Sequence, residues 1–116
     1  MRASIALACA LVFATAPARA ADILAAAYDP QTDEIVVDIA YRGTNPNHTF
    51  SLLWDPCKDG RTSARLVDRQ GNDEAREDYR VRERLSLKEL PCRPAVVTLR
   101  LGRVAHEDVY VPARRK

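Results

Sequence analysis

Apolar and polar residues alternate along most of this chain with a period of two, the pattern of strands that are buried on one face. Turn segments rich in Gly, Pro, Asn and Asp interrupt the pattern at intervals of about eight to twelve residues, a spacing typical of all-β domains. In the clearest segment the alternating apolar residues are Ile35, Val37, Ile39 and Tyr41. Seven strands are predicted, at residues 23–28, 34–42, 48–54, 63–68, 76–85, 95–101 and 106–111.

This succession of short strands predicts an all-β fold, a small immunoglobulin-like β-sandwich of about seven antiparallel strands. The segment 76–85 is rich in Glu and Arg, which also favour helices, but its apolar residues recur at every second position and therefore favour a strand. Ser86 and Glu89 have the spacing of a capping box, so one short helical turn is predicted at residues 86–90.

The first twenty residues have the features of a cleavable secretory signal. Arg2 supplies a positive charge, residues 5–14 are apolar, and Ala18 and Ala20 are small residues at the positions that a signal peptidase reads. Cleavage is expected after Ala20, and the alternative is a buried N-terminal helix. The expected organisation is a signal peptide at 1–20, one β-sandwich domain at 21–113 and a basic tail at 114–116.

Removal of the signal changes the charge balance. The full chain has 18 Lys and Arg against 16 Asp and Glu, and the loss of Arg2 and Arg19 would leave 16 basic residues against 16 acidic ones. A chain without net charge gives no general support for nucleic-acid binding. No apolar run reaches the roughly 18 residues of a transmembrane segment. We therefore expect a protein of the bacterial periplasm or the external medium.

Two cysteines follow the signal, Cys57 and Cys92, and in an exported chain such a pair predicts one disulfide. Cys57 follows the third predicted strand and Cys92 precedes the sixth, and these strands are antiparallel neighbours in an immunoglobulin-like sandwich. The two cysteines would then meet at one end of the domain. A redox or metal-binding thiol is the alternative, although the chain contains no Cys-x-x-Cys.

The sequence contains none of the common catalytic or cofactor motifs. It has no Gly-x-Ser-x-Gly nucleophile elbow, and its four glycines are too far apart for a phosphate-binding loop. We therefore predict that the protein is not an enzyme and has no cofactor. His48 and His106 begin the third and seventh predicted strands and are weak candidates for a metal site. The alternative is that both are half-exposed residues at strand ends.

Charged residues are frequent in and before the fifth predicted strand. The strand carries Arg76, Arg80, Arg82 and Arg84, which could form a docking ridge on one face, although acids lie among them. We favour an ordinary charged outer face that protects an edge strand from pairing. The acidic residues at this place are expected to be solvated: Asp73, Glu74, Glu77 and Asp78.

The segment 45–50, between the second and third predicted strands, resembles the binding loop of a known inhibitor family. Its sequence, Asn-Pro-Asn-His-Thr-Phe, is similar to the Asn-Pro-Thr-Thr-Gly-Phe segment of chagasin-type inhibitors. Those inhibitors insert this segment into papain-like cysteine proteases from an immunoglobulin-like domain. Thr49 stands where the family has glycine. The resemblance implies inhibition of a cysteine protease through residues 43–50.

These observations favour an exported, non-catalytic binding or accessory module of the bacterial cell envelope, whose partner is an envelope or extracellular protein. Recognition is usually placed on the loops of a rigid sandwich. The expected binding loop consists of Thr44, Asn45, Pro46, Asn47 and His48. The alternatives are an inhibitor of a cysteine protease and a periplasmic metal-binding protein that uses His48 and His106.

Overall fold

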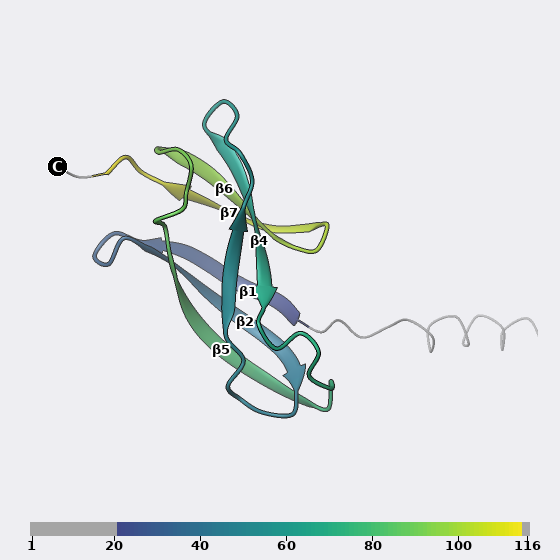
Figure 1. Ribbon diagram of the computed structural model, residues 1–116. Helices are drawn as coiled ribbons and strands as arrows, with labels where there is room; N and C mark the ends of the chain where they lie inside the picture. The colour runs from purple at the N-terminus through teal and green to yellow at the C-terminus, as the bar shows by residue number, and fades with distance from the viewer. Residues whose placement is uncertain (1–20, 115–116) are drawn as a thin grey trace, which may run out of the picture.

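Seven strands form two sheets that pack face to face in a sandwich-like arrangement (Figure 1). This computed structural model describes residues 21–114, so the predicted signal peptide at 1–20 and the end of the basic tail lie outside the described residues. β1 begins at Ala21, and cleavage after Ala20 would therefore leave all seven strands intact. The strands are β1 (Ala21–Asp29), β2 (Glu34–Gly43), β3 (Phe50–Trp54), β4 (Arg61–Asp68), β5 (Glu77–Ser86), β6 (Ala95–Leu101) and β7 (Val104–Val111).

The predicted strands are all present, and each predicted limit agrees with the structure to within two residues. The segment Glu77–Ser86 is a strand, as the period of its apolar residues predicts. The predicted inner face of β2 is confirmed, because the side chains of Ile35, Val37 and Ile39 are fully buried and Tyr41 is 2% exposed.

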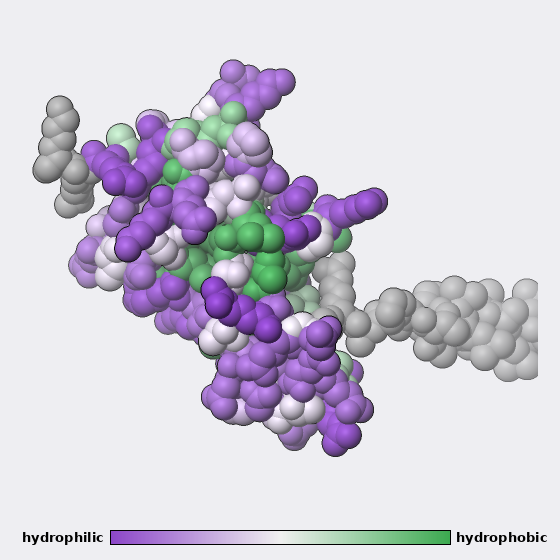
Figure 2. Space-filling model, in the orientation of Figure 1, coloured by the Kyte–Doolittle hydropathy of each residue, from purple (hydrophilic) through white to green (hydrophobic). Residues whose placement is uncertain are grey.

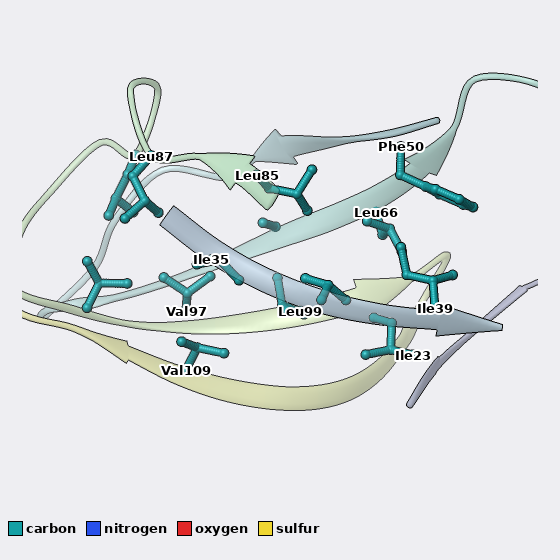
Figure 3. Close-up of a cluster of buried hydrophobic side chains, with 14 of the residues drawn as sticks. Ile23, Ile35, Ile39, Phe50, Leu66, Leu85, Leu87, Val97, Leu99 and Val109 are labelled. Atoms are coloured by element: carbon teal, nitrogen blue, oxygen red, sulfur yellow. The ribbon is translucent and has the colours of Figure 1, made fainter. Parts of the chain in front are cut away.

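The hydrophobic core lies between the two sheets and takes side chains from every strand (Figure 3). β2 and β6, which are inner strands of the two sheets, contribute Ile35, Ile39, Val97 and Leu99, all with no exposed surface. Burial of one such aliphatic side chain stabilises a fold by about 1.5–3 kcal/mol. The alternation of residues in these two strands therefore places four fully buried side chains in the core.

The order of strands in the larger sheet differs from the immunoglobulin-like expectation. One sheet has the order β1-β2-β5, and the other has the order β3-β4-β6-β7. The expected antiparallel neighbourhood of the third and sixth strands is wrong, because β4 lies between them and pairs with β6 in parallel. β3 has five residues and β4 has eight, so the longer strand takes the inner position, where both of its edges form ladders.

The predicted short helix at residues 86–90 is also wrong. The hydroxyl of Ser86 accepts the N–H of Lys88 rather than that of Glu89, so no capping box forms. A single hydrogen bond, from the N–H of Leu90 to the carbonyl of Leu87, closes a turn there before Pro91. Leu87 and Leu90 are both buried. Pro91 disfavours a helical conformation of the residue before it, so the segment does not extend beyond one turn. None of the described residues forms a helix able to cross a membrane.

The predicted disulfide is present, with Cys57 and Cys92 joined and their Cα atoms 6.2 Å apart. The two cysteines meet by a different route from the one expected. Cys57 lies in the connection between β3 and β4, and Cys92 lies just before β6. Because β4 and β6 are parallel, they begin at the same end of the sheet. The bond therefore ties the β3–β4 hairpin to the start of β6.

The two open sides of the sandwich differ. On one side β1 lies along β7. On the other side β3 and β5 approach each other where a carboxylate oxygen of Glu83 accepts the backbone N–H of Phe50 at 3.2 Å. Glu83 interrupts the inner apolar face of β5, and this hydrogen bond across the two sheets accounts for its position.

Candidate functional site

The predicted binding loop, residues 44–48, connects β2 to β3 and lies against the loop at 69–76, which connects β4 to β5. The backbone N–H of Arg69 donates to the carbonyl of Thr49 at 2.9 Å and continues the β3–β4 pairing beyond the strands. The two loops therefore share one end of the sandwich because their flanking strands are a hydrogen-bonded pair.

The side chain of His48 is buried where the two loops meet, with 1% of its surface exposed. Its Nδ1 lies 2.7 Å from the carboxylate of Asp68, and its Nε2 lies 2.7 Å from that of Asp73. The ring stacks on Tyr41, with 4.2 Å between the ring centroids. An imidazole donates hydrogen bonds from both nitrogens only when it is protonated, so this geometry fits an imidazolium between two carboxylates. We call His48, Asp68, Asp73 and Tyr41 the His48 clasp.

The charges in the clasp stabilise one another. Burial disfavours the charged ring of His48, but the hydrogen bonds of Asp73 and Asp68 outweigh this effect and raise the pKa of His48 above its ordinary 6.5. Hydrogen bonds from the backbone and hydroxyl of Thr44, followed by the bond from His48, hold the pKa of the Asp73 carboxyl well below its usual range. The imidazolium form of His48 is therefore more favoured here than in an unperturbed histidine.

Asp73 also fixes the beginning of the binding loop. Its carboxylate accepts the backbone N–H of Thr44 at 2.8 Å and the hydroxyl of Thr44 at 2.7 Å. Gly43, the last residue of β2, leaves the space that the clasp needs. A Cβ atom at this position would lie 2.7 Å from Oδ2 of Asp73 and 2.8 Å from Nε2 of His48, so a larger residue would displace them.

Gln70 ties the two loops together farther from the core. Its side-chain amide donates to the carbonyl of Asn47 at 3.1 Å and accepts from Nδ2 of Asn45 at 3.2 Å. The binding loop also carries its own turn, in which Oδ1 of Asn45 accepts the N–H of Asn47 at 2.9 Å. The hydroxyl of Tyr41 donates to the carbonyl of Asn45 at 2.9 Å. The loop is therefore held at several points along its length.

The exposed residues between β2 and β3 are uncharged: Thr44, Pro46, Asn47 and Thr49. The neighbouring loop, in contrast, exposes the charged pair of Arg76 and Glu74. The buried ring of His48 has no access to a substrate, and both of its nitrogens are engaged by carboxylates. The arrangement holds a short loop in one conformation, with the buried ring of His48 beneath its exposed residues.

The two histidines suggested for metal binding have different partners. His106 lies on β7, where its Nδ1 is 3.4 Å from the carboxylate of Asp22, and its buried Nε2 has no hydrogen-bond partner among residues 21–114. The expectation of half-exposed strand-end residues is wrong, because the side chains of His48 and His106 are 1% and 12% exposed. Residues 21–114 contain no group of three or more His, Cys, Asp or Glu side chains arranged to hold a metal ion.

The loop at residues 44–48 can be recognised in the sequence, but the residues that hold it cannot. Asp73 was expected to be solvated, and this is wrong, since its side chain is 15% exposed and contacts His48. Asp68 and Gln70 carry no motif, and they reach the binding loop only through the pairing of β3 with β4. The local signal that could have found them is the cluster of polar residues at 68–73, directly after an alternating strand.

A second buried cation lies at the opposite end of the sandwich, just before β6. The guanidinium of Arg93, 7% exposed, donates two hydrogen bonds to the carboxylate of Asp33, at 2.9 and 2.8 Å. A third hydrogen bond runs from its Nε to the carbonyl of Pro112 at 3.0 Å. The hydroxyl of Tyr28 donates to the same carboxylate at 2.7 Å. We call Arg93, Asp33 and Tyr28 the Arg93 clasp; it joins the β1–β2 turn to the end of β7.

Comparison with models of known protein families, with curated proteins and with solved structures finds no match for this chain. The geometry of the site therefore carries the functional argument alone.

Proposed function

We propose that this chain is an exported, non-catalytic binding module of the bacterial cell envelope, which recognises a protein partner through the binding loop at residues 44–48. The His48 clasp is the observation that carries the proposal. Burying an imidazolium and two carboxylates costs desolvation energy, which a simple connecting turn does not require. A loop that is already ordered loses less conformational entropy when it binds, so the clasp serves recognition.

Two further features support the proposal. The disulfide between Cys57 and Cys92 suits an oxidising compartment outside the cytoplasm. The order β1-β2-β5 agrees with that of the first, second and fifth strands of immunoglobulin-like sandwiches, which bind partners through loops at the ends of their sheets.

Partner capture tests the proposal. The tagged protein, produced in its own bacterium with its own signal, is recovered under native conditions, and the proteins retained on it are quantified by mass spectrometry. The variant Asn47→Lys alters an exposed side chain of the binding loop. Gln31→Lys, an exposed residue of the β1–β2 turn at the opposite end, is the matched control. We expect a partner that wild type and Gln31→Lys retain and Asn47→Lys loses; equal retention by all three proteins would refute the proposal.

Inhibition of a papain-like protease is the second candidate, because Pro46 and Asn47 are exposed on a fixed loop. It requires the loop to enter an active-site cleft without melting the clasp. The test is papain activity in a large molar excess of the purified protein, with Asn47→Lys as the control variant. Loss of activity with wild type alone would support this candidate, and full activity would exclude it.

A further inference from the structure

On the side of the sandwich where β3 and β5 approach each other, these two edge strands are protected to different degrees against pairing with another chain. Along β5, Arg82 pairs with Asp38 at 2.8 Å and Arg84 pairs with Asp29 at 2.9 Å. Such charges discourage another chain from pairing with an edge. β3, in contrast, contains no charged residue, and the side chain of Leu53 at its outer face is 50% exposed. β3 is therefore the edge that is open to another strand.

The backbone of β3 offers hydrogen-bonding groups on its free side. The N–H of Asp55 donates to the carbonyl of Ser63 at 2.9 Å, just beyond the ladder with β4. In an antiparallel pair, alternate residues direct their backbone groups to the same side, so Leu53 also faces β4. Leu52 and Trp54 then direct their N–H and C=O groups away from β4, and within residues 21–114 no second strand pairs with β3. An extended peptide would satisfy these groups.

A groove of about 370 Å³ follows this free edge. Figure 2 shows hydrophobic atoms gathered at the centre of this face, over β3 and β4, with hydrophilic atoms around them. Leu52 and Trp54 point toward the core from an edge strand and are only partly buried, so their flanks form apolar surface in the groove. The groove is lined by Leu52, Leu53, Trp54, Asp55, Pro56, Glu89 and Pro91.

The charged side chains of the groove are both acidic. Glu89 is exposed on the wall opposite β3. Asp55 is 52% exposed, and its nearest cation, Arg100, is 3.8 Å away. A ligand that carries basic side chains would complement these carboxylates.

We propose that the groove is a strand-addition site, in which an extended peptide with alternating apolar and basic side chains pairs with the free edge of β3 at Leu52 and Trp54. The backbone of the peptide supplies the partners for the two residues, its apolar side chains cover the flanks of Leu52 and Trp54, and its basic side chains face Asp55 and Glu89. A second copy of this chain is a poorer occupant, since β3 contains no basic side chain that could face Asp55 and Glu89. This site is separate from the binding loop, so each proposal fails or survives by itself.

Trp54 provides a direct probe, because it is the only tryptophan of the chain and it lines the groove. The ligand is a blocked pentapeptide of alternating lysine and valine, and binding is followed by tryptophan fluorescence. Two control peptides separate charge complementarity from backbone pairing. One replaces lysine by glutamate, and the other replaces the central valine by proline, which removes a backbone donor. We expect saturable binding of the lysine peptide, with affinity lower by about fivefold or more for each control.

Variants of the protein test the charge complementarity between the groove and the peptide. Glu89→Lys should weaken binding of the lysine peptide and improve binding of the glutamate peptide. Glu107→Lys makes the same charge change at an exposed residue of β7 and should leave both affinities unchanged. Equal affinity for the valine and proline peptides would show that no strand is added. A fluorescence change on concentrating the protein without peptide would assign the groove to a second copy. Either result, or the absence of saturable binding, overturns the proposal.

Discussion

Each end of the sandwich is closed by a buried cation held by carboxylate, but the two ends differ in what the cation is and in what else supports it. At the His48 end, an imidazole ring lies between the carboxylates of Asp68 and Asp73, which favour its protonated form, and the loops it joins have no covalent link. At the Arg93 end, a guanidinium binds one carboxylate with two parallel hydrogen bonds. The disulfide between Cys57 and Cys92 lies directly before Arg93 and adds a covalent tie.

The two ends differ in whether the charge of the buried side chain depends on pH. A guanidinium keeps its charge at any physiological pH, and the hydrogen bonds of Asp33 raise the pKa of Arg93 further. An imidazolium holds two carboxylates only while it is protonated. The Arg93 end is therefore built as a fixed closure, whereas at the other end the hydrogen bonds of His48 to both Asp68 and Asp73 require a proton on each ring nitrogen. Four predictions, from the largest effect to the smallest, test this contrast.

Removing the covalent tie should have the largest effect. The variant with Cys57→Ser and Cys92→Ser frees a loop closed across 35 positions of sequence. In the chain-entropy view, the free energy of unfolding should fall by about 3–4 kcal/mol. Urea denaturation followed by Trp54 fluorescence measures it, and wild type in a reducing agent should lose the same amount. A loss below about 1 kcal/mol would show that the Arg93 end holds without its disulfide.

Breaking the His48 clasp should come second. His48→Ala removes the buried ring, leaves Asp68 and Asp73 facing each other, and should cost about 2–3 kcal/mol. Hydrogen exchange should show faster exchange of the Thr44 amide, which Asp73 holds, while amides of β6 keep their relative protection. Gly43→Ala should also make the Thr44 amide exchange faster, because its Cβ would displace the side chains of Asp73 and His48. Unchanged exchange at Thr44 in both variants would contradict the role of the clasp.

These two clasps also show where a single sequence stops being informative. The inner face of β2 follows from a local period of two, and so do the limits of the strands, because burial on one face leaves its mark on adjacent residues. His48 meets Asp68 and Asp73 across 20 and 25 positions of sequence. Such contacts depend on which strands pair, and the position of β4 between β3 and β6 has no local signature. The partners of the loop were for this reason out of reach, although the loop itself was predicted.

Weakening the Arg93 clasp should have a smaller effect. Arg93→Lys keeps the charge but replaces a planar fork by one ammonium group, which reaches the carboxylate of Asp33 and loses the carbonyl of Pro112. We expect a loss of about 1–2 kcal/mol in the free energy of unfolding. Exchange at Thr44 should stay as in wild type, because the opposite end is intact. Faster exchange there would show that the two ends are coupled and would end the contrast between them.

The pH dependence should be the smallest effect and the one most specific to the His48 end. In the unfolded chain His48 titrates near its ordinary pKa of 6.5, and in the folded chain the two carboxylates raise that pKa. A raised pKa means that the folded state binds the proton more tightly. The stabilisation is therefore complete below about pH 6.5 and is lost as the pH rises through the folded pKa.

Urea denaturation between pH 5.5 and 9 should accordingly show unfolding free energy that decreases with rising pH in wild type. The decrease should vanish in His48→Gln, which keeps a polar side chain without the titration, and should persist in His106→Gln and in Arg93→Lys. Over the same pH range, the exchange rate of the Thr44 amide should increase by more than the intrinsic effect of pH on amide exchange. If His48→Gln kept the slope of wild type, the proton on His48 would not be what orders the binding loop, and both ends of the sandwich would be fixed closures.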